Sequence, residues 1–227
     1  MRWPFPYLTR AWPRQPSAFL LLVLGITVVL YPFADAFSAI RLIVQALDIA
    51  IVLVVVRTLK LHTLWLRSAW LISLPLVLLQ CAHLFWPDVF LIQVPMLLAQ
   101  ILFHAYAVVL LLGYVLRDEI ITIDELYALA CIYVLMALLW ASAYALVVLA
   151  NPEAIYINPS NNPDGIFGWS DLVYFSMTTL TSVGYGEITP VSPGARALAM
   201  LQQVVGVLYV AILIARLTGM HRSGIKG

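Results

Sequence analysis

Long apolar stretches separated by short polar segments dominate the pattern along this chain. A helix needs about 20 apolar residues to cross the hydrocarbon part of a bilayer. Stretches near that length lie at Ala18–Tyr31, Ala36–Val56, Ser68–Trp86, Val89–Leu116, Glu125–Ala150 and Ala195–Leu217. The pattern therefore predicts an all-α membrane protein with six transmembrane helices.

The first stretch, Ala18–Tyr31, is short, and its flanks leave a second interpretation open. Three basic residues, Arg2, Arg10 and Arg14, precede it. The run Ala34-Asp35-Ala36 follows it, and this combination is also typical of a cleavable signal peptide. We expect an intact first span, with removal of the N-terminal part as the alternative.

The composition agrees with a membrane protein. Of the 227 residues, 63% are apolar and 10% charged, which is too few charges to cover the surface of a soluble domain. The net charge of +1, with no basic patch, excludes an electrostatic footprint for nucleic acid. Cys81 and Cys131 lie inside apolar stretches and indicate neither a disulfide framework nor a zinc site. Lipid is the expected partner.

The positions of Lys and Arg predict the orientation, because cytoplasmic segments carry an excess of them. With the N-terminus inside, the predicted cytoplasmic set is Arg2, Arg10, Arg14, Arg57, Lys60, Arg67, Arg117, Arg216, Arg222 and Lys226. Only Arg41 and Arg196 lie toward the outside. We expect a multi-pass protein of the plasma (cell inner) membrane with both termini in the cytoplasm.

The segment between the fifth and sixth stretches has a different composition. Asn151–Gly168 is rich in Asn, Pro and Gly and predicts an extracellular loop. Trp169–Leu180 follows and is too short to cross the bilayer, with Ser170 or Asp171 placed to cap its N-terminus. We predict a re-entrant helix here, between the fifth and sixth spans.

A run without helical character comes next, Thr-Thr-Leu-Thr-Ser-Val-Gly-Tyr-Gly-Glu from Thr178 to Glu187. Each unsatisfied peptide group costs several kcal/mol in lipid, so such backbone at membrane depth is expected to line a water-filled path. Gly184 and Gly186 flank Tyr185 and allow conformations closed to other residues, so that successive carbonyls can point the same way. A row of carbonyls can replace the water shell of an ion.

This run resembles the selectivity filter of the potassium channels, Thr-Val-Gly-Tyr-Gly followed by Asp. Ser182–Glu187 matches four positions identically and two conservatively. The resemblance extends over roughly Glu125–Gly219. Further matching residues are Trp169, Tyr174, Phe175 and Thr179–Thr181 in the pore helix, and Arg196 and Gly206 in the inner helix.

The resemblance implies a potassium-conducting homotetramer, since the one filter strand in each chain cannot encircle an ion. The implied filter residues are Ser182, Val183, Gly184, Tyr185 and Gly186. The carbonyls of the first four would bind K⁺, with the Ser182 hydroxyl at the innermost site, while Thr181 and Glu187 support the filter. Ser182 replaces the usual Thr and Glu187 the usual Asp, changes expected to affect filter stability more than ion identity. No cofactor is expected besides potassium as the permeant ion.

The inner helix carries two further candidates. Gly206 is either the gating hinge that the resemblance implies or a small residue that allows close helix packing. Val207, Val210 and Ile214 share one helical stripe and either line the cavity or make ordinary helix contacts. The pore helix would aim its partly negative C-terminal end at a cation in that cavity.

We predict two domains, residues 1–117 with four spans and residues 118–227 with the pore. The first resembles a voltage sensor in the number of spans but lacks its regularly spaced basic residues. The fourth span carries Gln93, Gln100 and His104 on one face, which favours a polar seam over a sensing role.

Other polar residues of the first domain leave alternatives open. Arg41, Gln45 and Asp48 share one face of the second span, as functional charges or as an internal ion pair or polar network. His83 and His104 lie in neighbouring spans, so a haem ligated by both histidines is an alternative. Their different depths in the membrane disfavour it.

We conclude from the sequence that the protein is a channel and not an enzyme. The alternatives are a weakly selective cation channel, which the intact Gly184-Tyr185-Gly186 disfavours, and a transporter or redox protein with a re-entrant loop. Because ten residues follow Leu217, we expect no cytoplasmic nucleotide- or calcium-binding domain there. The gating stimulus and the direction of flux are not encoded in these patterns.

Overall fold

A computed structural model describes residues 15–34, 37–58, 63–87, 89–116, 122–160, 162 and 167–223. Several basic residues that carry the predicted orientation lie outside this part, namely Arg2, Arg10, Arg14, Lys60, Arg117 and Lys226. The described chain is mostly helical and divides into two compact units, with residues 122–136 in the first and 137–223 in the second. The predicted division at residue 117 stays a prediction.

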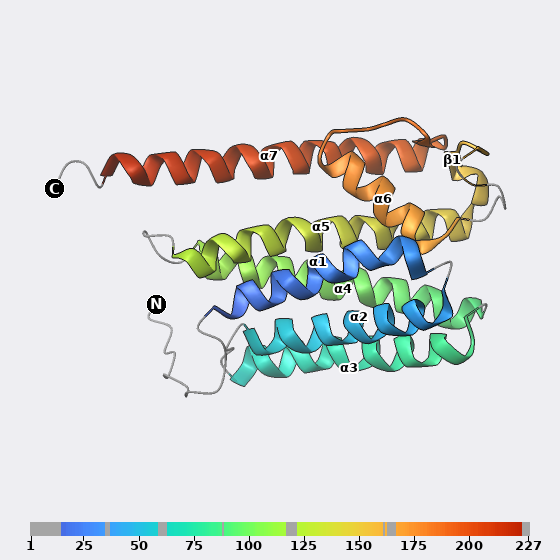
Figure 1. The fold of residues 1–227 in the computed structure, drawn as a ribbon, viewed down its shortest axis with the longest axis horizontal. Helices are drawn as coiled ribbons and strands as arrows, with labels where there is room; N and C mark the ends of the chain where they lie inside the picture. Colours follow the sequence, from blue (N-terminus) through green and yellow to red (C-terminus); the bar gives the residue numbers. More distant parts are fainter. Residues whose placement is uncertain are drawn as a thin grey trace. The chain divides into compact units, whose positions relative to one another are not determined.

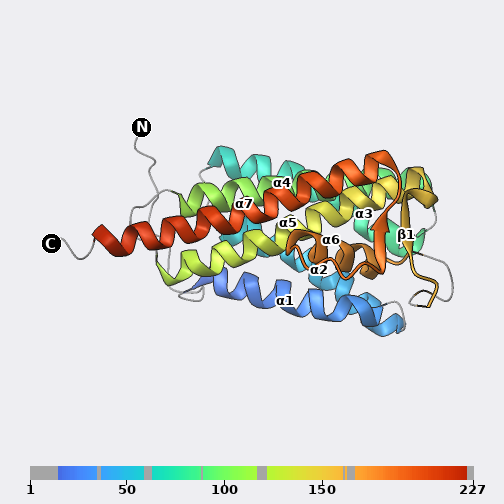
Figure 2. The same ribbon diagram turned by 90° about the horizontal axis from the view of Figure 1, so that it is seen from above.

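The first unit contains four long helices. They are α1 (Pro16–Ala34), α2 (Ser38–Thr58), α3 (Thr63–Phe85) and α4 (Phe90–Val115). Each packs against the next one along the chain, and Figures 1 and 2 show them running side by side. Leu20, Leu24, Phe103 and Leu111 are among the fully buried side chains of this unit. The helices coincide with the first four apolar stretches of the sequence.

The start of α5 (Ile123–Ala150) is anchored in the first unit. The Asp124 carboxylate accepts hydrogen bonds from the Ser17 backbone N–H and hydroxyl, both at 2.9 Å, and from the Tyr114 hydroxyl at 3.0 Å. A carboxylate at the first turn of α1 complements the helix dipole. This anchor and Pro16 at the first helical position explain why α1 begins before the apolar stretch.

The second unit contains the rest of α5, a short 3-10 turn (Pro152–Ala154), β1 (Ile155–Ile157), α6 (Trp169–Leu180), β2 (Ile188–Pro190) and α7 (Pro193–Ser223). Figure 1 shows α6 lying obliquely between α7 and the second half of α5. The core of this unit contains Tyr144, Ala154, Ile155, Leu172, Phe175, Ile188 and Ala195. The short helix expected at Trp169–Leu180 corresponds to α6, and its re-entrant position in a membrane stays a prediction.

The two strands are a feature that the sequence analysis did not predict. β1 pairs antiparallel with β2, with Ile155 opposite Pro190 and Ile157 opposite Ile188. The ladder continues where the Asn158 N–H donates to the Glu187 carbonyl at 2.8 Å. A three-residue strand gives almost no alternating pattern of apolar and polar residues, so the sequence predicted a loop over the whole of Asn151–Gly168. The pairing ties the segment after α5 to the segment that leads into α7.

Five described helices are long and apolar enough to cross a membrane. They span Pro16–Ala34, Ser68–Phe85, Phe90–Val115, Ile123–Ala150 and Pro193–Thr218. The predicted second span coincides with the 21-residue α2. These helices indicate a multi-pass membrane protein, while the count of six spans and the orientation stay predictions.

Candidate ion-conduction site

The N-terminus of α6 is capped from within its own first turn. Gly168 is the N-cap residue, and its N–H donates to the Asp171 carboxylate at 2.9 Å. A carboxylate here completes half of a capping box and faces the positive end of the helix dipole. The sequence analysis placed Ser170 or Asp171 at the cap itself; Asp171 contributes instead from the third helical position, because the helix begins at Trp169.

The C-terminus of α6 holds the segment that follows it, residues 182–187, which we call the filter segment. The Ser182 N–H donates to the Thr179 carbonyl at 3.1 Å. The N–H groups of Val183 and Gly184 both donate to the Thr178 carbonyl, at 2.9 and 3.2 Å. These bonds satisfy carbonyls that the end of a helix leaves without partners. The first three residues of the filter segment are therefore fastened to α6 through their amide N–H groups.

The carbonyls of the filter segment are arranged differently from its amides. Within the described part of the chain, no hydrogen bond is recorded for the carbonyls of Ser182, Val183, Gly184 or Tyr185. Three N–H groups of the filter segment are thus hydrogen-bonded to α6, while four of its carbonyls have no hydrogen-bond partner among the described residues. These residues are exposed in the single chain, so four consecutive carbonyls are free to bind a ligand.

The backbone dihedral angles of the filter segment alternate. φ is +58° at Ser182, +50° at Gly184 and +94° at Gly186, while Val183 and Tyr185 have no positive φ. Alternating signs of φ turn successive peptide groups toward the same side of the chain. Glycine takes positive φ without cost, whereas Ser182 accepts roughly 1–2 kcal/mol of strain. The alternation agrees with the row of carbonyls expected from the sequence.

Contacts of the side chains hold the outer part of the filter segment. The Tyr174 hydroxyl on α6 donates a hydrogen bond to the Glu187 carboxylate. The rings of Tyr174 and Tyr185 stack at 6.4 Å between centroids and are nearly parallel. Thr181, the other predicted support residue, donates its hydroxyl to the Met177 carbonyl at 2.8 Å and so closes the last turn of α6. Glu187 and Thr181 thus lie where they can brace the filter segment from its two ends.

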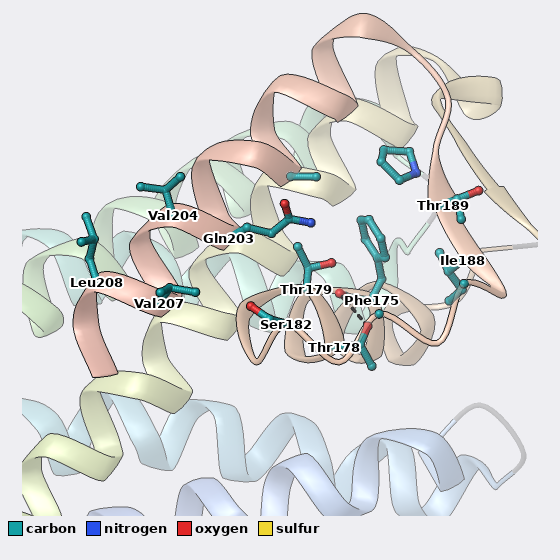
Figure 3. Close-up of a pocket in the computed structure, with 14 residues that line it drawn as sticks. Phe175, Thr178, Thr179, Ser182, Ile188, Thr189, Gln203, Val204, Val207 and Leu208 are labelled. Atoms are coloured by element: carbon teal, nitrogen blue, oxygen red, sulfur yellow. Dashed lines mark hydrogen bonds between the residues drawn. The ribbon is translucent and has the colours of Figure 1, made fainter. Parts of the chain in front are cut away.

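A groove of about 660 Å³ lies beside the filter segment in the second unit (Figure 3). Ser182, Gly184 and Gly186 line it together with the C-terminal half of α6. The lining residues from α7 include Gln203, Val204, Val207 and Leu208. All five residues from Ser182 to Gly186 are exposed in the single chain, Tyr185 by 74%.

The predicted cavity residues lie along one face of α7. Val207 lines the groove, as Ser182 does. Val210 and Ile214 follow at helical spacing and are exposed, by 40% and 55%. All three aliphatic side chains of this stripe are thus exposed among the described residues. Their role as a cavity wall stays a prediction.

Gly206 is buried where α7 crosses the end of α6. A Cβ atom at this position would lie 2.2 Å from the carbonyl oxygen of Leu180 and 3.0 Å from its Cδ1. Real atoms do not approach that closely, so α7 can reach α6 only because residue 206 has no side chain. This contact supports the packing interpretation of Gly206, and the hinge stays a prediction.

Three buried polar residues near α6 were missed by the sequence analysis, namely Tyr144, Ser176 and Gln202. They form hydrogen bonds with one another. The available signal was Gln202 itself, an amide inside an apolar span and one turn from Gly206. Polar side chains in such segments usually pair with neighbouring helices.

The polar residues of the first unit fall into local contacts. Asp48 accepts a hydrogen bond from the Tyr31 hydroxyl at 2.7 Å, and Arg41 donates to the Ala34 carbonyl at 3.4 Å. No salt bridge joins Arg41 to Asp48, both of which are described. Gln93 donates to the Pro87 carbonyl at 2.6 Å. These contacts favour the polar-network alternative over an internal ion pair.

Comparisons with known proteins point to the same part of the chain. The sequence profile of a family described as "Ion channel" matches residues 128–222, which include α6, the filter segment and nearly all of α7. Protein LctB of Bacillus caldotenax is 32% identical over 98 residues, 42% of this chain and 72% of that protein. Protein LctB of Geobacillus stearothermophilus is 31% identical over the same length. The potassium channel protein kcv of Paramecium bursaria Chlorella virus 1 is 36% identical over 53 residues, 23% of this chain and 55% of that protein.

Proposed function

This chain belongs to the pore-loop potassium channel family, and we propose that it is the subunit of a homotetrameric channel selective for K⁺. The observation that carries the proposal is the filter segment: the N–H groups of Ser182, Val183 and Gly184 are held by α6, while the carbonyls of Ser182–Tyr185 accept no hydrogen bond from the described residues. A permeating ion needs such oxygens to replace its water shell.

The proposed selectivity for K⁺ follows from this difference between the bonded N–H groups and the unbonded carbonyls of the filter segment. Bonds from Ser182, Val183 and Gly184 to the Thr178 and Thr179 carbonyls would resist movement of the filter segment along the pore and so support a constant spacing between its carbonyls. In four chains around one axis, each carbonyl level would form a ring of four oxygens. The exposed Tyr185 and the apolar face of α7 would then be covered by neighbouring chains.

The location and partners belong to the same proposal. We place the channel in the plasma (cell inner) membrane, with both termini cytoplasmic and lipid around the outer helices. The permeant K⁺ is the only ion required, and neither a cofactor nor a nucleic acid has a part in the mechanism. A weakly selective cation channel is the nearest alternative, followed by a transporter or redox protein.

The decisive test is reconstitution of the purified chain in planar bilayers under opposed potassium and sodium gradients. We expect single-channel steps that reverse near the potassium equilibrium potential, and cross-linking of the same preparation to give bands up to four chains. Reversal near zero would indicate the weakly selective channel. Counter-transport without steps, a haem absorbance band or a conducting monomer would contradict the proposal.

A second expected result is that opening depends little on voltage. Steep voltage dependence requires three or four charges in each of four subunits to move through the field. The fourth span, α4, carries no Lys or Arg, and Arg41 and Asp48 on α2 carry opposite charges, so their movement together nearly cancels. We expect the conductance–voltage curve from about −100 to +100 mV to have a slope below about one elementary charge. A slope of several charges that Arg41→Gln or Asp48→Asn flattens would make the first four helices a voltage sensor.

A further inference from the structure

A chain of buried hydrogen bonds connects three helices next to the filter segment. The Gln202 amide on α7 is fully buried, and its Nε2 donates to the Ser176 carbonyl at 2.9 Å and to the Ser176 hydroxyl at 2.8 Å. Its Oε1 accepts from the Tyr144 hydroxyl at 2.7 Å. The Ser176 hydroxyl in turn donates to the Ala137 carbonyl at 2.6 Å.

The chemistry of the groups fixes the direction of every bond. Gln202 Oε1 can only accept, so the proton between it and Tyr144 comes from the phenol. The Ser176 oxygen accepts from Gln202 Nε2, which leaves its own proton for Ala137. This chain of hydrogen bonds, which we call the circuit, begins at Tyr144 and ends at Ala137, about two turns apart on α5. Since an unpaired polar group in such an interior is costly, α6 has one favoured position between α5 and α7.

This circuit lies one helical turn from the contact between Gly206 and Leu180 at the end of α6. Gln202 and Gly206 are four residues apart on α7, and their partners Ser176 and Leu180 are four residues apart on α6. Between these partners lies Thr178, whose carbonyl accepts the N–H groups of Val183 and Gly184. A rotation of α6 would move this carbonyl and the filter backbone with it.

We propose that Gln202 and Tyr144 are positioning residues for potassium selectivity, acting through Ser176 on α6 and through Thr178 on the filter segment. The inference rests on the proposed function of the channel. Both side chains are fully buried and neither lines the groove beside the filter segment, so their effect would be on where α6 holds the filter carbonyls. The ring of Tyr144, at 4.8 Å from that of Phe175, packs against α6 as well.

The test compares permeability ratios of single channels made from the full chain. Tyr144→Phe removes one hydroxyl and keeps the ring, and because one buried hydrogen bond is lost in each of four chains, we expect it to lower the potassium-to-sodium permeability ratio by at least about tenfold. Gln202→Leu is expected to lower it further. Tyr127→Phe, on α5 but outside the circuit, is the matched control and is expected to leave the ratio unchanged.

The double variant Tyr144→Phe/Gln202→Leu separates positioning from general stability. Replacing both partners by apolar groups of similar shape removes the orphaned atoms between them, so oligomer stability should recover toward the wild type. The permeability ratio should stay low, because the bonds to Ser176 are still absent. Loss of oligomer with an unchanged ratio in the remaining channels would overturn the inference. A wild-type channel without potassium selectivity would instead overturn the proposed function.

Discussion

Replacing Gly186 or Gly184 by Ala is expected to abolish potassium-selective current while the protein still inserts and assembles. Apart from the glycine and its two chain neighbours, no atom of the described residues lies within 4 Å of a Cβ built at either position, so crowding by those residues is not the cause. The cause is the backbone, since φ is +94° at Gly186 and +50° at Gly184. An L residue in the left-handed region costs roughly 1–2 kcal/mol, and a channel of four chains carries that cost four times.

The two positions should differ in severity. The left-handed region allowed to L residues reaches only about +70°, so Gly186→Ala is expected to be the worse variant. Summed over four chains, even the milder cost corresponds to more than about a hundredfold loss of the selective conformation.

The measurement is the reversal potential and single-channel conductance under opposed potassium and sodium gradients. Gly25→Ala in α1 is the matched control, because it also has open space but no positive φ. Undiminished selectivity in both filter variants would remove the filter assignment.

Gly206→Ala is expected to destabilise the second unit rather than change only the gating of the channel. The added Cβ would meet the Leu180 carbonyl oxygen at 2.2 Å, and this oxygen belongs to the helix backbone and cannot rotate away. Overpacking of this kind costs roughly 3 kcal/mol per chain. We expect a lower thermal unfolding temperature of the oligomer. We also expect loss of selectivity, since Leu180 directly precedes Thr181, which supports the filter segment.

The hinge interpretation of Gly206 predicts a different outcome. If the residue acts only by flexibility, Gly206→Ala should leave oligomer stability and the permeability ratio unchanged and alter only the open probability. Gly113→Ala, at an open position in α4, is the control for an added methyl group in a helix. Thermal unfolding measured beside the open probability separates the two interpretations.

Much of this protein could be predicted from local sequence. Apolar runs predicted the long helices because a membrane helix satisfies its own backbone and needs only a continuous apolar surface. The short Trp169–Leu180 and the two glycines around Tyr185 predicted a half-crossing helix and an unusual backbone, because length and φ are local properties. The resemblance to potassium channels rests on the same local run.

Tertiary structure decided the features that depend on residues far apart in the chain. The pairing of β1 with β2 joins segments more than 30 residues apart, and neither strand is long enough to show alternation. The role of Gly206 followed only from the position of Leu180, and the role of Gln202 only from Tyr144 on one side and Ser176 on the other. A side chain in an apolar helix has no partner in its own sequence neighbourhood. Which partners it meets is determined by how the helices pack.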